Sequence, residues 1–256
     1  MAGRPLKTEA VVLRSFRFGE ADRVLHLYTL ERGRVGAVAK GIRKTKSRFG
    51  ARLEPLSHVE VLLHRGSGDL HTVTGAALER PHQAVRDDYG RLSVGLIGAE
   101  ATLRLFSEEE ANPRVFEALT RFLDVLEQAD SPRGRPELDP LSLAFQLKLL
   151  WLAGYLPHLT SCAECGAEDA PLVGYSPRAG GAVCRACAGE AHAVGLTPQG
   201  IAGAEELLGR PLAEAREAGL TDRAARDALT IVTASYEYHG GFRMRTLGSR
   251  AAAPAR

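Results

Sequence analysis

The first eighty residues of the chain contain short hydrophobic runs, rich in β-branched residues, that are separated by turn-forming residues. Runs of this length predict β-strands. Five strands are predicted, at residues 11–18, 24–30, 34–39, 58–64 and 70–74. The breaks between them contain glycine and polar residues that accept turn conformations. Five strands in this length favour a small β-barrel, either a partly open five-stranded OB-fold or an SH3-like barrel, of which the OB-fold fits better.

Beyond the fifth strand the hydrophobic period changes to that of amphipathic helices. Predicted helices cover residues 92–106, 112–128 and 139–154, and two more begin at Thr197 and Thr221. Asn112, Asp139 and Thr197 are each followed by proline, and an N-cap residue with a first-turn proline starts a helix. The third helix is apolar on most sides, so we expect it to be the buried centre of a helical domain.

The four cysteines of the chain occur as two C-x-x-C pairs with eighteen residues between them. This spacing is typical of a zinc ribbon, in which each pair supplies two thiolates to one tetrahedral ion. The sequence therefore predicts one structural zinc ion bound by Cys162, Cys165, Cys184 and Cys187. Four protein ligands leave no open coordination position, so this metal would not activate water.

Two disulfides are the alternative for these cysteines. The amino terminus has no signal-peptide pattern and no apolar run is long enough to span a membrane. We therefore expect a reducing, cytoplasmic location, in which thiolates bind metal rather than pair as disulfides. His158 and His192 flank the cysteines, but a complete set of four thiolates needs no histidine ligand.

These patterns together predict an α+β multidomain protein. An OB-fold barrel is expected at residues 1–80, followed by an all-α domain at residues 81–159 and 191–247. The zinc ribbon at residues 160–190 is expected to be an insert in the helical domain, and residues 248–256 to be a disordered tail.

The formal net charge of +2 conceals a strong segregation of charge along the chain. Residues 1–52 contain thirteen Lys and Arg against four Asp and Glu, whereas residues 53–239 contain sixteen basic and twenty-seven acidic residues. A basic amino-terminal domain predicts a polyanionic partner, for which nucleic acid is the leading class. An anionic membrane surface is the weaker alternative, because the basic segment lacks the bulky apolar residues of a surface-bound helix.

The densest basic segment lies between the third and fourth predicted strands, and it reads AVAKGIRKTKSRFGARLEP. Its cations attract phosphates without regard to base sequence. An exposed aromatic ring beside such cations would stack on bases, and Phe49 is the best placed, since strand alternation can bury Phe16, Phe18 and Tyr28. The predicted nucleic-acid contacts are Lys40, Arg43, Lys44, Lys46, Arg48, Arg52 and Phe49, extended by Arg14 and Arg34.

The order of four segments resembles the RecO family of bacterial recombination mediators. These are AVVLRSFRFGEADRVLHLYT, GRVGAVAKGIRKTKSRFGARLEP, LKLLWLAGYLP before the first cysteine pair, and GG-x-x-C-R-A-C. The resemblance implies an OB-fold that binds single- and double-stranded DNA, a helical domain and an inserted zinc module. It assigns DNA contacts to Lys40, Arg43, Lys44, Lys46 and Arg48, and zinc to the four cysteines.

The resemblance also implies partners and an activity. Members of the family anneal complementary strands coated with single-stranded-DNA-binding protein, and with RecR they help RecA to load in the RecF pathway. They have no catalytic centre and act at the nucleoid. The resemblance therefore implies a cytoplasmic, non-enzymatic DNA repair protein with DNA, RecR and single-stranded-DNA-binding protein as direct partners and RecA as an indirect one.

Two other functions remain alternatives on the residues alone. A nucleic-acid enzyme with a structural zinc would need catalytic motifs, yet the chain has no phosphate-binding loop, no H-E-x-x-H and no deaminase signature. Its acidic clusters at residues 87–88 and 108–110 are interpreted as solvated polar segments at helix ends. The other alternative is a zinc-ribbon adaptor that chiefly binds protein and binds nucleic acid only secondarily.

Overall fold

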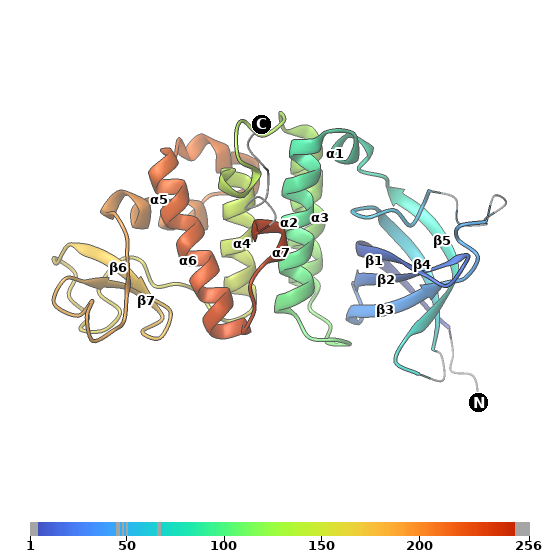
Figure 1. The fold of residues 1–256 in the computed structure, drawn as a ribbon, viewed down its shortest axis with the longest axis horizontal. Helices are drawn as coiled ribbons and strands as arrows, with labels where there is room; N and C mark the ends of the chain where they lie inside the picture. The colour runs from blue at the N-terminus through green and yellow to red at the C-terminus, as the bar shows by residue number, and fades with distance from the viewer. Residues whose placement is uncertain (1–4, 45–46, 48, 50, 66–67, 249–256) are drawn as a thin grey trace, which may run out of the picture. The chain divides into compact units, whose positions relative to one another are not determined.

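The computed structural model of the protein describes residues 5–44, 47, 49, 51–65 and 68–248. The chain forms two compact units, residues 1–129 and residues 130–256. The first contains a β-barrel and three helices, and the second contains helices and a small three-stranded sheet (Figure 1). The domain limits predicted above divide the chain differently and stay a prediction, and residues 249–256 of the predicted disordered tail lie outside the described residues.

The barrel closes in the strand order β1-β2-β3-β5-β4, with β4 returning to β1. Neighbouring strands are antiparallel except β3 and β5, which pair in parallel through only two residue pairs, Ala37 with His71 and Val38 with Thr72. This is the OB-fold, as predicted. The strands are β1 (Leu6–Phe18), β2 (Asp22–Thr29), β3 (Gly33–Ala39), β4 (His58–Arg65) and β5 (His71–Arg80).

Side-chain alternation in β1 is interrupted by a β-bulge between Val12 and Arg14. Ala10 and Val12 belong to the hydrophobic core inside the barrel. Beyond the bulge Arg14 and Phe16 are exposed, although strict alternation with Val12 would have directed them inward. The extra residue, Leu13, therefore moves the last part of the strand's sequence onto the barrel surface.

Three helices complete the first unit: α1 (Gln83–Asp87), α2 (Tyr89–Leu105) and α3 (Pro113–Gln128). The Asn112 side chain accepts a hydrogen bond from the Val115 N–H, so α3 begins where the sequence predicted. Helix α2 begins three residues earlier than predicted, because Asp88 caps it by accepting from the Arg91 N–H. Both helices contact β1.

The second unit is organised around α4 (Pro140–Leu152), whose side chains are nearly all buried. It packs against α5 (Pro198–Gly209) and α6 (Asp222–Gly240), which confirms the prediction of a buried central helix. The remaining elements are the 3-10 helices η1 (Pro136–Leu138) and η2 (Leu212–Ala218), the short α7 (Arg245–Gly248), and the strands β6 (Leu172–Ser176), β7 (Gly181–Cys184) and β8 (Val194–Gly195). Among the described residues no helix has the length and apolar character needed to cross a bilayer.

Candidate metal centre and nucleic-acid interface

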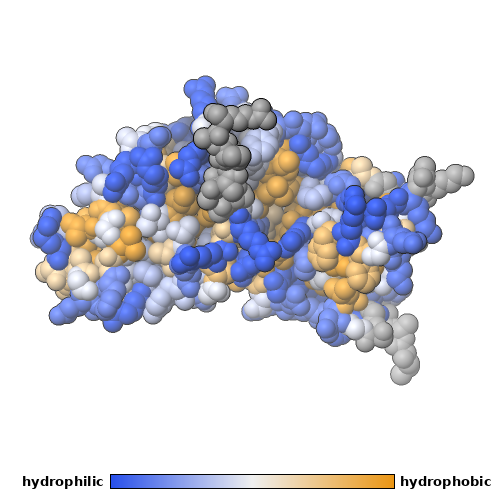
Figure 2. Space-filling model, in the orientation of Figure 1, coloured by the Kyte–Doolittle hydropathy of each residue, from blue (hydrophilic) through white to orange (hydrophobic). Residues whose placement is uncertain are grey.

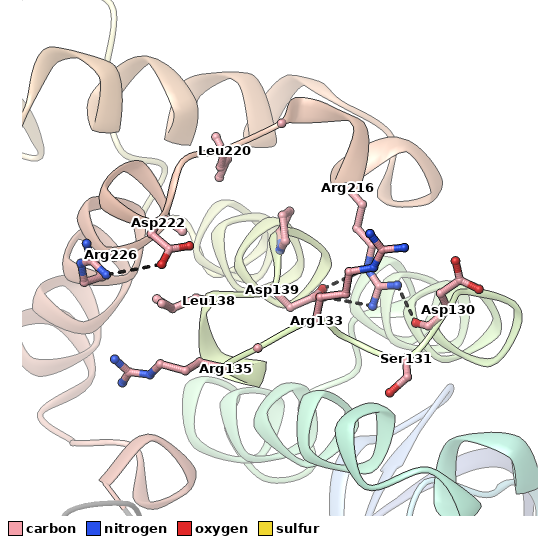
Figure 3. A pocket seen from close by; sticks show the side chains of 14 residues that line it. Asp130, Ser131, Arg133, Arg135, Leu138, Asp139, Arg216, Leu220, Asp222 and Arg226 are labelled. Atoms are coloured by element: carbon pink, nitrogen blue, oxygen red, sulfur yellow. Dashed lines mark hydrogen bonds and ion pairs between the residues drawn. The ribbon is translucent and has the colours of Figure 1, made fainter.

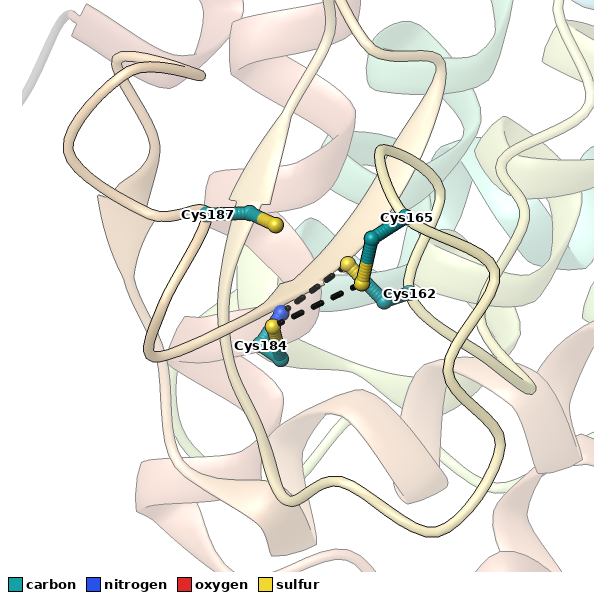
Figure 4. A group of neighbouring side chains, drawn as sticks. All are labelled: Cys162, Cys165, Cys184 and Cys187. Atoms are coloured by element: carbon teal, nitrogen blue, oxygen red, sulfur yellow. Dashed lines mark hydrogen bonds between the residues drawn. The ribbon is translucent and has the colours of Figure 1, made fainter.

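The structure brings the four cysteines together at the end of the β6–β7 hairpin. Their sulfur atoms all lie within 4.8 Å of one another, and the side chains converge from two separate loops (Figure 4). In the first loop Gly166 adopts a φ of +76°, and its N–H donates to the Cys162 carbonyl at 2.8 Å. In the second, the Ala188 N–H donates to the Cys184 carbonyl at 3.0 Å. Each C-x-x-C pair is thus folded by a tight turn that directs both sulfurs inward.

The electrostatics of the cluster favour a bound cation. Burial opposes ionisation of Cys162, but backbone N–H groups, that of Cys184 foremost, outweigh burial and lower its pKa to about 6. Hydrogen bonds with the Cys165 and Cys184 thiols raise the pKa of Cys187 to about 12. Cys162 therefore loses its proton readily, whereas Cys187 resists a second negative charge nearby. A bound metal ion would stabilise both thiolates.

All four cysteines are free thiols. The Sγ atoms of Cys165 and Cys184 are 3.9 Å apart, far beyond the ~2.05 Å of a disulfide bond. Two disulfides are therefore not the arrangement of this fold. Four convergent sulfurs are a complete tetrahedral donor set for a soft or borderline metal ion, so these residues can hold one.

His158 and His192 lie outside the cluster of possible ligands. The His158 ring contacts the Ser161 hydroxyl at 2.6 Å, and its backbone pairs with β7 through the Ala182 N–H. The His192 ring contacts the Glu190 carbonyl at 3.0 Å. Their partners are polar groups of the surrounding loops.

Three of the predicted phosphate contacts, Lys40, Arg43 and Lys44, form an exposed turn after β3. The turn is fixed to the β1–β2 connection, since the Gly41 N–H donates to the Asp22 carboxylate at 2.7 Å. The Arg43 N–H also donates to the Ala21 carbonyl, at 2.9 Å. The cations are thereby held beside the end of β1. Lys46 and Arg48 lie outside the described residues.

The remaining predicted cations differ in how far their charge is available. Arg14 is exposed, and its guanidinium carbon lies 5.8 Å from the centre of the Phe16 ring. Arg52 is exposed too, and it bonds the Phe49 carbonyl at 3.5 Å. Arg34 is different, because its guanidinium donates to the Leu103 carbonyl at 2.7 Å and pairs with Glu108 at 3.3 Å. The charge of Arg34 is therefore already engaged within the protein.

Three of the four aromatic residues are arranged opposite to the expectation, whereas Tyr28 is buried as expected. Phe49 is only 1% exposed and belongs to the barrel core, together with Ile42 and Leu53 from the same connection. A ring at that depth presents no face to a base, so the prediction that Phe49 stacks on bases is wrong. Phe16 and Phe18 are instead 40% and 52% exposed, because of the bulge in β1. The sequence signal that could have revealed this surface is the run Phe16-Arg17-Phe18 directly before a turn.

Phe16 and Phe18 lie beside the basic turn. Phe18 pairs with Asp22, the residue that holds the turn after β3, and Phe16 pairs with Val24. Hydrophobic atoms bordered by hydrophilic ones are visible on the barrel in Figure 2. We call the surface formed by Arg14, Phe16, Phe18, Lys40, Arg43 and Lys44 the aromatic–basic face.

Comparison with known proteins agrees with this architecture. The family model for the recombination protein O N-terminal domain matches residues 1–82, and the model for its C-terminal domain matches residues 86–248. The chain belongs to the recombination protein O family. A relative from Rubrobacter xylanophilus, named DNA repair protein RecO, is 41% identical over 224 residues, which cover 86% of this chain and 87% of the relative.

Two further relatives carry the same name. The one from Anaeromyxobacter sp. strain K is 36% identical over 244 residues, covering 93% of both chains. The one from Nocardioides sp. is 36% identical over 241 residues, covering 91% of this chain and 93% of the relative. The N-terminal family model spans the barrel, and the C-terminal family model spans α2 to α7 with the cysteine cluster.

The region matched by the recombination protein O C-terminal model also contains a pocket that the sequence did not predict. It has a volume of about 550 Å³ and is lined by Arg133, Arg135, Arg216 and Arg226 together with acidic residues (Figure 3). Arg216 is held by Asp139 at 3.0 Å. Arg226 lies 4.0 Å from Asp222, a longer and weaker pairing. The arginines come from distant parts of the sequence, which is why no local pattern revealed them.

Proposed function

We propose that this protein is a non-enzymatic mediator of DNA repair that binds single- and double-stranded DNA without sequence specificity. The observation that carries the proposal is the aromatic–basic face, two exposed phenylalanines beside a turn of three cations on an OB-fold. Surfaces of this composition bind single strands by stacking bases and neutralising phosphates. Membership in the recombination protein O family, and the name DNA repair protein RecO of its relatives, support the same function.

Each part of the face has a separate role in this proposal. Lys40, Arg43 and Lys44, with Lys46, Arg48 and Arg52 farther along the connection, contact phosphates. Phe16 and Phe18 receive bases, and each stacked base contributes ~1–3 kcal/mol. Every base has a flat π face, so stacking of this kind accepts any sequence.

Annealing follows from the charge of this surface. Two complementary strands repel each other through their phosphates, and bound cations reduce that repulsion by replacing counterions. We propose that the protein anneals strands coated with single-stranded-DNA-binding protein and, with RecR, assists RecA loading at the nucleoid in the cytoplasm. The alternative is an adaptor whose main ligand is protein.

We assign zinc to the cysteine cluster. Four thiolates at tetrahedral spacing form a closed structural site that suits Zn²⁺ better than hard cations such as Mg²⁺. The ion would connect the loops that carry Cys162–Cys165 and Cys184–Cys187 and so stabilise the β6–β8 sheet. With its coordination sphere complete, it would contribute to folding and not to a reaction.

The arginine-lined pocket of the second unit is the proposed site for the acidic tail of a single-stranded-DNA-binding protein. Arg133 and Arg226 contribute positive charge, and the side chains of Leu138 and Leu220 supply apolar surface in the same pocket. An acidic peptide that ends in apolar residues complements both.

The deciding experiment is fluorescence anisotropy of a labelled single-stranded oligonucleotide, titrated over a series of salt concentrations. Lys40, Arg43 and Lys44 are changed together to Ala. The matched control changes three exposed arginines outside the barrel, Arg114, Arg121 and Arg185.

Each phosphate contact with a single strand contributes about −0.7 to the slope of log K against log salt concentration. Loss of three contacts should therefore make this slope shallower by about 2. The control should retain the wild-type slope. Equal losses in both variants would show that binding is non-local, and absence of binding at low salt would favour the adaptor.

A further inference from the structure

The connection between α2 and α3 lies across the weakest seam of the barrel. Strands β3 and β5 share only two residue pairs, and near the start of β3 Arg34 pairs instead with this connection. Arg34 and Glu108 form a parallel bridge, and the Glu109 N–H donates to the Arg34 carbonyl at 2.9 Å. We call residues 107–111, which read Ser-Glu-Glu-Glu-Ala, the acidic strap.

The strap places its carboxylates on basic side chains of the barrel. Glu108 lies 3.3 Å from the Arg34 guanidinium. Glu109 contacts two groups, the Arg32 guanidinium at 3.5 Å and the His71 ring at 3.0 Å. A small hollow of about 200 Å³ lies beside these contacts, and its charged and histidine lining consists of Arg34, Arg65, His71, Asp69, Glu108 and Glu109. Two of the three glutamates interpreted from sequence as solvated, Glu108 and Glu109, are therefore docked on a basic surface.

The chemistry of these contacts is that of phosphate binding. A guanidinium presents the same fork of N–H donors to a carboxylate as to a phosphate. The strap carboxylates thus stand where the oxygens of a nucleic-acid backbone would sit if the strap moved away. The basic groups also belong to the OB-fold that carries the aromatic–basic face.

We propose that Arg32, Arg34, Arg65 and His71 form a second phosphate-binding site on the barrel, and that the acidic strap occupies it as an internal competitor of DNA. This inference rests on the proposed function, because the competing ligand is the backbone of bound nucleic acid. Displacement of the strap extends the DNA path from the aromatic–basic face to the β3–β5 seam.

The strap is held by contacts that are readily exchanged. The Glu108 and Glu109 side chains are 59% and 36% exposed, and ion pairs at such sites are weak and screened by salt. Glu109 has a φ of +54°, in the left-handed region that residues other than glycine rarely adopt. Release of the strap relieves that conformation and frees the cations for phosphates.

The first test compares two variants of equal charge. Glu108→Gln with Glu109→Gln removes the carboxylates that contact the basic groups. Glu79→Gln with Glu117→Gln removes two exposed carboxylates outside the strap that form no salt bridge with a described residue. Single-stranded oligonucleotide binding is measured by anisotropy over a salt series for wild type and both variants.

The strap variant should bind at least threefold more tightly than the charge-matched control at moderate salt. Its salt slope should be steeper by about 0.7 for each additional phosphate that the freed cations neutralise. Equal affinities and slopes in the two variants would overturn the inference. Loss of binding in wild type and all variants would instead refute the proposed function.

A charge-neutral variant gives an independent test. A Cβ on Gly33 would collide with the Glu110 carbonyl, so Gly33→Ala pushes the strap from the barrel without changing any charge. Gly33 has a φ of +61°, so the β2–β3 turn is strained as well, and a thermal melt must first show that the variant is folded. A folded Gly33→Ala protein with tighter DNA binding supports the inference, and one with unchanged binding contradicts it. If the variant does not fold, the glutamine pair decides.

Discussion

The hydroxyl oxygens of Tyr175 and Ser235 lie 2.7 Å apart in a buried hydrogen bond between β6 and α6. Burial raises the pKa of Tyr175, so its hydroxyl stays protonated and available for this bond. The contact fixes the cysteine-bearing sheet to the helices of the second unit. The Ser235 hydroxyl also donates to the Ile231 carbonyl at 2.8 Å, so Tyr175 is the donor in the link between β6 and α6.

Replacement of Tyr175 by Phe should lower the stability of the second unit. A lost buried hydrogen bond costs ~1 kcal/mol, which corresponds to a decrease of about 2–4 °C in Tm for a chain of this size. Differential scanning calorimetry provides the measurement. Tyr238→Phe is the control, since Tyr238 is 56% exposed, and its Tm should equal that of wild type. Equal Tm values for the two variants would show that the link contributes nothing.

Removal of the metal should unfold the β6–β8 sheet and leave the helices largely intact. Binding free energy at a structural Zn²⁺ site is on the order of 10 kcal/mol, so loops held by such an ion would depend on it for their fold. Hydrogen exchange before and after chelation should show loss of protection at residues 160–196 and retained protection in α4. Unchanged protection after complete metal removal, verified by elemental analysis, would contradict a structural role.

Replacement of Phe16 and Phe18 by Ala should weaken binding of single-stranded DNA more than binding of duplex DNA. Each lost stacking contact costs ~1–3 kcal/mol on a single strand, whereas duplex bases are already stacked inside the helix. Anisotropy with both ligands measures the difference. Tyr89→Ala removes an exposed aromatic residue on α2 and should leave both affinities unchanged. An equal fold-loss of affinity for single-stranded and duplex DNA would show that the surface binds through its charges and not by stacking.

The carboxyl group of Glu109 should titrate below its ordinary value. The hydrogen bond from His71 is the main cause of this lowered pKa, and nearby cations add to it. Because the folded pKa lies below the ordinary 4.5, the stabilisation is present above about pH 4.5 and is lost as the pH falls through the folded value. Carboxyl NMR titration measures the midpoint. His71→Gln should raise it toward 4.5, and a wild-type midpoint at 4.5 would refute the assignment.

Replacement of Arg133 and Arg226 by Ala should weaken binding of the acidic tail peptide of a single-stranded-DNA-binding protein. Loss of two charge-assisted hydrogen bonds of ~1.5–3 kcal/mol each predicts at least a tenfold increase in Kd, measured by isothermal titration calorimetry. Arg121→Ala with Arg185→Ala removes the same charge elsewhere. An equal effect of the control pair would mean that the peptide responds only to net charge.

Local signals allowed much of the fold to be predicted from sequence. Asn112, Asp139 and Thr197 begin their helices as N-caps in the structure, because capping depends on residues only a few positions apart. The cysteine cluster was predictable for the same reason. Strand β5 was predicted too short, since its second half is rich in Gly and Ala, which propensity disfavours but pairing with β4 accommodates.

Features that depend on distant contacts could not be predicted in this way. Phe49 follows a run of cations and was interpreted as part of an exposed loop, yet it fills the end of the barrel. Glu108 and Glu109 find their partners on strands more than thirty residues away. Burial and ion pairing at these positions are decided by tertiary structure, which overrides local composition.

The bulge at Leu13 has a consequence for how this protein tolerates change. Before the bulge the even-numbered residues Ala10 and Val12 lie in the core, whereas after it the even-numbered residues Arg14, Phe16 and Phe18 lie on the surface. If the Leu13 codon were lost, Arg14 would follow Val12 directly, and regular alternation would keep the Arg14 charge and both phenylalanines on the surface. Loss of a codon between Arg14 and Phe16 would instead direct both phenylalanines into the barrel lumen. The aromatic–basic face is therefore more vulnerable to a change in strand length beyond the bulge than to loss of the bulge residue itself.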